Sequence, residues 1–269
     1  MQKLFILLYC TFILLSGTSC NVYHHIEYPP VSQELAKPNP KIEKLVQQAR
    51  QGKTEAYDAL ALCYRNGEGV KQSDFNMMTM YLLSCKKSGK DIKKIIASLG
   101  EDDPIHLLID VLCHSRIENV PQESIEKLRN ISPADALIYD AFYTFREIND
   151  TLMAERLIQK AIAGGSDMAC IIQIATYELL GNKEKLKQAL HKYADRFPVL
   201  YVRLGEMYMR GETEEHLEQA VKYFTYADKY GMLTMNGARS LSNAYRILEE
   251  KGKIKYDRQE MKRLKKLAQ

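Results

Sequence analysis

One spacing of residues recurs along this sequence and restricts the folds that are open to it. The steps are four, three, four and four residues. The complete copies are Asp74, Met78, Tyr81, Cys85 and Gly89, then Asp150, Ala154, Leu157, Ala161 and Gly165, then His216, Ala220, Tyr223, Ala227 and Gly231. Such steps place the middle members on one helical face, after a polar N-cap and before a glycine that ends the helix. The pattern predicts repeated amphipathic helices, and no segment shows sustained period-two alternation.

Weaker copies extend the pattern. Asn182 starts the same spacing, but Phe197 stands where glycine is expected, and a copy that starts at Asp257 is cut off by the chain end. A second helix precedes these copies and carries an aromatic residue at a matching position. These aromatics are Tyr64, Phe142, Tyr177, Tyr208 and Tyr245, at intervals of 78, 35, 31 and 37 residues. Helix pairs with a period in the thirties are typical of a solenoid, in which each unit packs on its neighbours.

The interval of 78 residues is two periods long, so it predicts a degenerate unit at about 91–133. Pro104 and Pro121 are each expected to begin a helix there, because proline is tolerated in the first helical turn. A chain of 269 residues could instead hold two ordinary domains. The repeat favours one array.

The segment that begins at Ala56 indicates which repeat this is. It has the sequence AYDALALCYRNGEGV, followed by Asp74, Tyr81 and Gly89. It resembles the Sel1-like repeat, a variant of the tetratricopeptide helix pair with a G-x-G-V loop between its helices. The resemblance covers most of 41–269 and is closest at 54–89 and 199–231. It implies an all-α solenoid of about six helix pairs in a right-handed superhelix, with a protein partner on its concave face.

The N-terminus predicts export. A short basic start precedes an apolar run at 4–15, which is too short to remain as a membrane-spanning helix. Small residues then lead to Cys20, in an order that resembles a bacterial lipoprotein signal. The resemblance implies removal of 1–19 and acylation of Cys20, which would anchor the protein to a membrane. Cleavage by ordinary signal peptidase, which would give a soluble exported protein, is the alternative.

The residues after Cys20 predict a location and a tether. In lipoproteins, Asp at the next position often retains the protein at the inner membrane, and here that position is Asn21. The resemblance therefore favours the outer membrane, facing the periplasm. Residues 20–40 contain four prolines, which remove backbone donors and hold the chain extended. We expect this segment to separate the membrane from a repeat domain at 41–269.

Catalytic motifs are absent from the sequence, which has no P-loop, dinucleotide-binding glycine fingerprint, H-E-x-x-H or G-x-S-x-G. One group could bind zinc, because its four residue types are zinc ligands and share one helical face. Its members are His106, Asp110, Cys113 and His114. Apolar residues crowd the rest of that helix, so its polar residues would gather on an exposed stripe without any metal. We favour the stripe, and we expect no cofactor and no catalytic residue.

Four cysteines remain after the leader and Cys20, namely Cys63, Cys85, Cys113 and Cys170. Export would permit disulfides, and Cys63 and Cys85 lie on the two helices of one unit. We favour buried free thiols, which behave as small apolar side chains.

The tyrosines fall into two groups. Tyr64, Tyr208 and Tyr245 recur at equivalent positions and are predicted to pack within the repeats. Tyr201 and Tyr226 lie outside that position, so they are candidates for lining a binding surface.

The formal charge of +4 is concentrated at one end. Residues 251–269 hold eight Lys or Arg against two acidic residues, which leaves a slightly acidic body. Proteins that bind nucleic acid usually carry a strong basic excess, so we expect no nucleic-acid partner. We interpret the basic segment as a solvated helix; a site for anionic lipid or nucleic acid is the alternative.

Together these features favour a non-enzymatic scaffold, anchored by lipid in the bacterial cell envelope, that binds another protein. The resemblance suggests a role in an assembly for secretion or for exopolysaccharide export. Two other classes stay open. A hydrolase would need a polar cluster on the concave face, and a binder of peptidoglycan or polysaccharide would need exposed aromatics with carboxylates. For an array, loss of 236–269 is expected to weaken both stability and partner binding.

Overall fold

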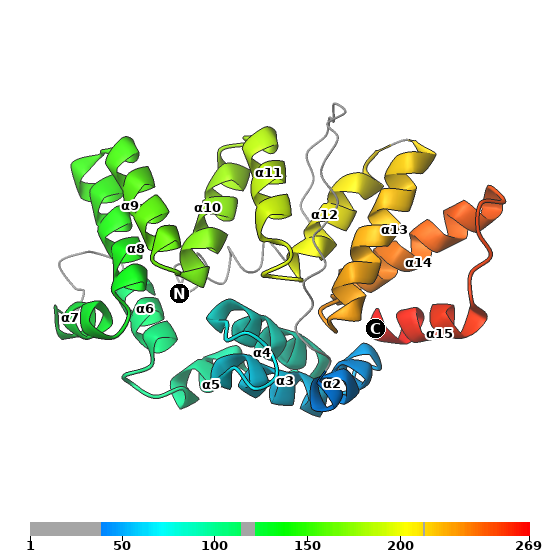
Figure 1. The fold of residues 1–269 in the computed structure, drawn as a ribbon, viewed down its shortest axis with the longest axis horizontal. Coiled ribbons are helices and arrows are strands. Elements are labelled where there is room, and N and C mark those ends of the chain that lie inside the picture. Colours follow the sequence, from blue (N-terminus) through cyan, green and yellow to red (C-terminus); the bar gives the residue numbers. More distant parts are fainter. Residues whose placement is uncertain (1–38, 114–121, 212) are drawn as a thin grey trace. The chain divides into compact units, whose positions relative to one another are not determined.

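A computed structural model describes residues 39–113, 122–211 and 213–269, and every regular element within them is a helix (Figure 1). The predicted signal peptide, Cys20 and nearly all of the tether lie outside the described residues. Within them, the all-α prediction is confirmed, and helices that follow one another in the chain pack together. The structure divides into two compact units: unit 1 spans 91–186, and unit 2 combines 39–90 with 187–269.

Unit 1 contains consecutive helices from the middle of the chain. They are α5 (Ile92–Ser98), α6 (Pro104–Cys113), α7 (Gln122–Ile131), α8 (Pro133–Tyr143), the π-helical turn η2 (Thr144–Ile148), α9 (Thr151–Ala163) and α10 (Asp167–Leu179). Helix α6 begins at Pro104, as predicted, whereas Pro121 lies outside the described residues. Buried Asp135 links α8 to the start of α10, because Ser166 Oγ donates to it at 2.5 Å and Ser132 Oγ at 2.6 Å.

Unit 2 contains the first and the last helices that the structure describes. They are α2 (Pro40–Arg50), α3 (Thr54–Asn66), α4 (Asp74–Ser88), α12 (Leu200–Met209), α13 (Glu214–Lys229), α14 (Met235–Glu250) and α15 (Arg258–Leu267). Helix α11 (Lys183–Tyr193) crosses the boundary between the units.

Helix α4 shows how local sequence sets the boundaries. Gly89 ends it with φ 71°, a left-handed conformation that favours glycine, as predicted. Its N-cap is Ser73 instead of the predicted Asp74, because Ser73 is extended and its Oγ accepts from the Asn76 N–H at 3.2 Å. Asp74 is the first helical residue, where a carboxylate still favours the positive end of the helix dipole. The predicted caps Asp150, Asn182 and Asp257 are confirmed by side-chain bonds to N–H groups of the following turn.

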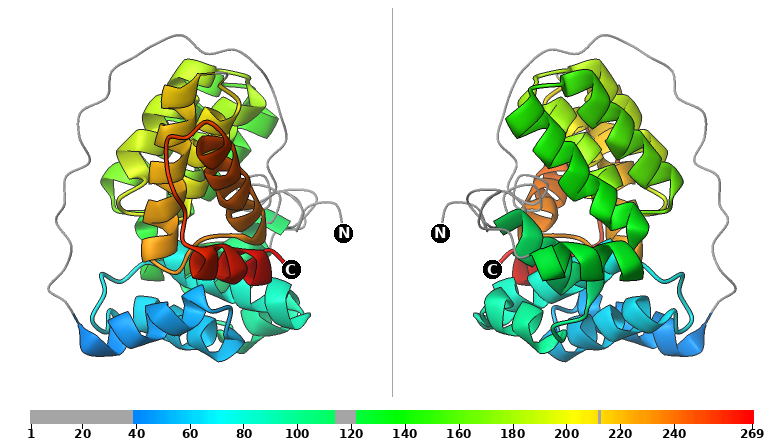
Figure 2. Two further views of the ribbon diagram at one scale, coloured as in Figure 1. Left: turned by 90° about the vertical axis from the view of Figure 1, so that its right-hand side faces the viewer. Right: turned by 90° about the vertical axis from the view of Figure 1, so that its left-hand side faces the viewer.

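Contacts within unit 2 join residues from opposite ends of the chain. Lys87 Nζ donates to the carbonyl oxygen of Leu267 at 2.7 Å, which ties α4 to the last turn of α15. In Figures 1 and 2, α15 accordingly lies beside the helices at the start of the described chain, with contacts to α2 and α4. The repeat pattern predicted packing between neighbouring units only, so this contact between α4 and α15 is an addition that the sequence did not reveal.

An ion cluster forms the centre of that contact. The Asp228 carboxylate on α13 is 4% exposed and accepts from Arg50 Nε at 2.9 Å and from Arg263 Nη2 at 2.7 Å. Arg263 on α15 also donates to the carbonyl oxygen of Arg50 at 2.9 Å and pairs with Glu260. The hydrogen bond from Arg263 lowers the pKa of Glu260. The cluster therefore holds α2, α13 and α15 together by charge-assisted bonds, the stronger kind of hydrogen bond.

Candidate functional site

The glycine loop that follows α3 forms one side of a groove in unit 2. Gly67 and Gly69 both have positive φ, at 70° and 71°. A Cβ on Gly69 would lie 2.1 Å from Asn39 Nδ2, so only glycine lets the loop approach the start of α2 this closely. Ser73 N–H donates to the Tyr64 carbonyl oxygen at 3.0 Å and closes the loop. The G-x-G-V motif thus shapes the surface between α2 and α3.

The opposite side of the groove comes from the other end of the chain. Residues 195–198 connect α11 to α12, and 229–230 form the end of α13. Asn76 Nδ2 donates to the Arg196 carbonyl oxygen at 2.9 Å, and the Phe75 ring meets the Phe197 ring edge-on at 5.1 Å. These contacts fix the 195–198 segment against the start of α4.

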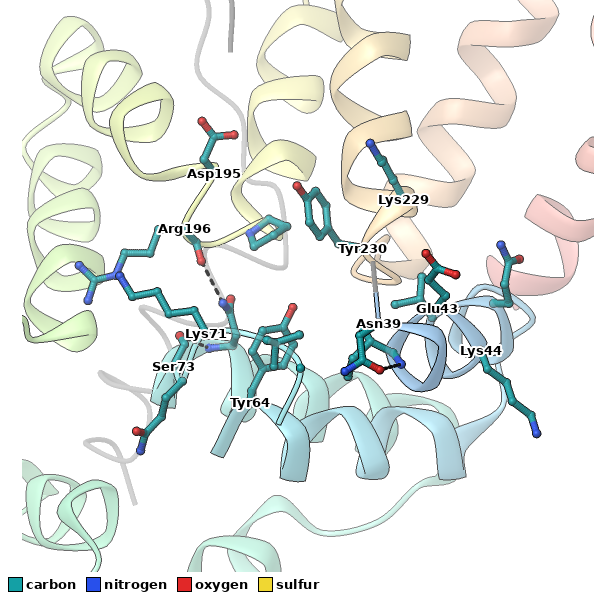
Figure 3. A pocket seen from close by; sticks show the side chains of 18 of the residues that line it. Asn39, Glu43, Lys44, Tyr64, Lys71, Ser73, Asp195, Arg196, Lys229 and Tyr230 are labelled. Carbon is teal, nitrogen blue, oxygen red and sulfur yellow. Dashed lines mark hydrogen bonds between the residues drawn. The ribbon is translucent and has the colours of Figure 1, made fainter. Parts of the chain in front are cut away.

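Between the two sides lies a groove of about 890 Å³ (Figure 3). This volume lies within the range of ligand-binding clefts. Its floor is formed by buried Tyr64, Ser73, Asn76 and Pro198, and most residues around its rim are exposed. The lining residues that the structure describes all belong to unit 2.

The rim is positively charged. Figure 3 shows Lys44 on α2, Lys71 on the glycine loop and Lys229 at the end of α13, and all three are exposed. Among the described residues, no ion pair neutralises any of these three lysines. Arg196 adds a fourth cation, while Glu43 and Asp195 are the two carboxylates among the described residues that line the groove. The excess of two positive charges favours an anionic ligand.

Asn76 places an unsatisfied acceptor on the floor. Its side chain is buried, with the residue 4% exposed, and its Nδ2 is held by the Arg196 carbonyl oxygen. Because a carbonyl can only accept, this bond fixes which side-chain atom is nitrogen. The other atom, Oδ1, is buried and has no hydrogen-bond partner among the described residues. A buried acceptor without a donor costs about 1–3 kcal/mol, so a donor that reached this atom would be favoured.

Two tyrosines contribute neutral hydroxyl groups. Burial, with a smaller effect of Tyr230, raises the pKa of Tyr64. Burial and the nearby Asp195 carboxylate also raise the pKa of Tyr230. Both phenols therefore stay protonated at neutral pH and are able to donate. Tyr64 was predicted only to pack within its repeat; it is 8% exposed and buried as expected, but it also lines the groove.

The two tyrosines that were predicted to line a binding surface lie in an aromatic cluster instead. Tyr201 is 2% exposed, donates to Asp195 and stacks on Tyr223 with ring centroids 6.1 Å apart, so the prediction for Tyr201 is wrong. Tyr226 is half-buried, and the centroid of its ring lies 5.3 Å from that of Tyr201. Neither tyrosine lines the groove. The reason is that α12 packs on α13 along this face, which the spacing within a single helix does not disclose.

His191 joins this cluster and makes unit 2 sensitive to acid. Its ring meets the Tyr223 ring edge-on, with the ring centroids 5.6 Å apart. Burial, together with the Lys187 cation, lowers the pKa of His191 from 6.5 to about 4. Between these two values the unfolded chain binds more protons than the folded chain. The stability contributed by neutral His191 is therefore complete above pH 6.5 and is lost as the pH falls towards 4.

We expect the free energy of unfolding to fall by about 1–2 kcal/mol between pH 7 and pH 4.5 through His191 alone, a figure already reduced for partial solvent screening. Urea unfolding of His191→Gln at the two pH values should show a correspondingly smaller difference. His106→Gln serves as the matched control and should retain the wild-type difference. Equal pH dependence in the wild type and His191→Gln would contradict the assignment.

The proposed zinc ligands are only partly described. His106 Nδ1 lies 2.9 Å from the Gly100 carbonyl oxygen, and Asp110 accepts from Ser124 Oγ at 2.9 Å. The side chain of Cys113 and all of His114 lie outside the described part of the structure. Within that part, no three His, Cys, Asp or Glu residues are grouped for a metal ion. The zinc hypothesis rests on the sequence alone.

The favoured prediction for the cysteines is confirmed where they are described. Cys63, Cys85 and Cys170 are buried thiols outside any disulfide, and the Cys63–Cys85 bridge is not formed. Burial raises the pKa of Cys63, which keeps this thiol protonated.

Sequence reasoning missed the residues that complete the groove, notably Asn76, Arg196 and Tyr230. Asn76 and Arg196 are 120 residues apart, and their contact depends on the packing of α4 against the segment between α11 and α12. The glycine loop was the only part of the groove that a sequence motif marked.

Comparison with known protein families, curated proteins and solved structures finds no match to this chain. Among the described helices, none combines the length and apolar character that crossing a bilayer requires.

Proposed function

We propose that this protein is a scaffold of the bacterial cell envelope, held at the membrane by acylated Cys20, that binds a partner protein. In this proposal the chain folds as about six Sel1-like helix pairs in a right-handed superhelix and catalyses no reaction. The anchor places it on the outer membrane, facing the periplasm. Its partner belongs to an envelope assembly, such as one for secretion or exopolysaccharide export. Nucleic acid is not a ligand.

One observation supports a binding role above the others, namely the groove of unit 2. It has a buried floor and an exposed rim. Among the described residues, three lysines of the rim are unpaired and one acceptor of the floor, Asn76 Oδ1, lacks a donor. A chain that only needed a stable core would gain by satisfying that acceptor internally. In this proposal the helices hold the groove in shape, and the groove residues make the contacts with the partner protein.

Crosslinking in intact envelopes tests the proposal. We expect a tagged full-length chain to retrieve one or a few proteins reproducibly after crosslinking, and a chain that lacks 236–269 to retrieve less. The truncation removes α14 and α15, and with them the Arg263 contacts to Asp228 and Arg50, so it should also lower the melting temperature. Retrieval of no protein above a mock-tagged control, or unchanged retrieval by the truncated chain, would overturn the proposal.

A second function is favoured by one feature of the groove. Half-buried Tyr230 lies close enough to Asp195 for that carboxylate to raise its pKa, and Glu43 also lines the groove. An aromatic ring with neighbouring carboxylates suits binding, or hydrolysis, of peptidoglycan or another polysaccharide. A pull-down with purified peptidoglycan discriminates the two functions, because the protein-binding scaffold should stay in the supernatant.

A further inference from the structure

We propose that the groove of unit 2 binds an extended, acidic peptide segment of the partner. In this complex Asn76 accepts a hydrogen bond from the peptide backbone, and the rim lysines pair with its carboxylates. The inference rests on the proposed protein-binding function and adds the chemistry of the partner. It follows from two properties of the groove, namely its charge and its unsatisfied acceptor.

The charge argues for acidic side chains. Lys44, Lys71 and Lys229 line the groove, are exposed and form no ion pair with any described residue. They stand on three separate segments, so a ligand that satisfies all of them must run along the groove. Carboxylates repeated along a chain meet this requirement, whereas a neutral glycan leaves the cations without partners.

The unsatisfied acceptor argues for a peptide. Asn76 Oδ1 needs a donor, and a polypeptide presents one backbone N–H at almost every residue. Inorganic polyphosphate and other fully ionised anions carry no such donor at neutral pH. Charge alone would admit them, but the floor of the groove favours a ligand that also donates.

The conformation of the peptide follows from the same requirement. In a helix most N–H groups bond internally, so a helical ligand has no free donor along its length. An extended segment keeps its N–H and C=O groups available on its edges. The hydroxyls of Tyr64 and Tyr230, which burial helps to keep protonated, are suitable donors for peptide carbonyls.

Fluorescence anisotropy with a labelled octaglutamate peptide tests the inference on the full-length chain in a neutral detergent. We expect saturable binding that weakens as salt is added, and no binding of octalysine. The Lys71→Glu/Lys229→Glu double variant should weaken the affinity about tenfold to a hundredfold, since each reversal replaces an attraction by a repulsion. Both lysines are exposed, so the fold should be retained.

The matched control is Lys222→Glu/Lys262→Glu, which makes the same change in net charge on α13 and α15 at exposed positions away from the groove. It should leave the affinity within about twofold. An equal loss in the control would show that the chain attracts the peptide only through its overall charge, and this would overturn the groove as the site.

Inorganic polyphosphate of similar charge tests the role of Asn76. We expect the wild type to bind octaglutamate more tightly than polyphosphate, and Asn76→Leu to lose this preference. Equal binding of both probes by the wild type would contradict a peptide ligand. Binding of chitohexaose without binding of octaglutamate would assign the groove to glycans instead.

The crosslinking experiment separates the two levels of the proposal. If a protein is retrieved equally well by the wild type and by Lys71→Glu/Lys229→Glu, the scaffold function stands and the acidic-peptide inference fails. If no protein is retrieved, the scaffold function fails whatever octaglutamate does.

Discussion

The Asp228→Asn variant is expected to lose about 3–5 kcal/mol of unfolding free energy, because it removes one partner of a buried ion cluster. Asp228 is 4% exposed in its side chain and accepts from both Arg50 and Arg263. An asparagine keeps the shape but removes the charge, so two guanidinium groups that are themselves largely buried lose their shared counterion. Urea unfolding followed by circular dichroism at pH 7 measures the loss.

Asp140→Asn is the matched control, because it removes one carboxylate from an ion pair at the surface. Arg129 Nη2 lies 2.7 Å from Asp140, but the arginine side chain is 54% exposed. Solvent screens such a pair, and we expect a loss of less than about 1 kcal/mol. If both variants lose the same small amount, the Asp228 cluster does not hold the first and last helices together.

The Phe197→Ala variant is expected to lose about 3–5 kcal/mol through the cavity that it leaves. The ring is 0% exposed, meets Phe75 edge-on at 5.1 Å and lies 6.5 Å from the Tyr193 ring. Phe197→Gly restores the residue that the repeat pattern predicts at this position, and we expect it to be at least as destabilising. Thermal unfolding followed by circular dichroism ranks the variants.

Phe145→Ala is the control for the loss of a phenyl ring. This residue is 53% exposed, so the substitution should change the stability by no more than about 0.5 kcal/mol. A Phe197→Gly variant as stable as the wild type would show that the ring is a tolerated departure from the repeat. It would then not anchor the 195–198 side of the groove.

Local structure was largely predictable from the sequence. The spacing from Asp74 to Gly89 predicted a helix that ends at that glycine, and α4 does so, with its N-cap displaced by one residue to Ser73. Such features depend on residues within one or two turns, which periodicity and capping preferences describe directly.

The groove was not predictable in the same way. Its glycine loop stood out as a motif, but Asn76 resembles any polar residue near the start of a helix. Arg196 acquires its role only through contact with a helix 120 residues earlier. Phe197 was visible as a departure from the repeat, yet nothing nearby in the sequence indicated that Phe75 would pack against it. Single-helix periodicity contains no information about such distant pairs.

The contact between α2 and α15 has a consequence for how this protein comes apart. The terminal units of a linear array have one neighbour each, so they fray first and unfolding spreads inward from them. Here Arg263 on α15 bonds to the Arg50 carbonyl oxygen on α2, and Lys87 on α4 bonds to the Leu267 carbonyl oxygen, so α15 is also supported by α2 and α4. Opening of α15 therefore breaks contacts with the start of the described chain as well. The groove is lined by residues of α2 and of the end of α13. A peptide bound there would contact both segments and so stabilise their packing against each other.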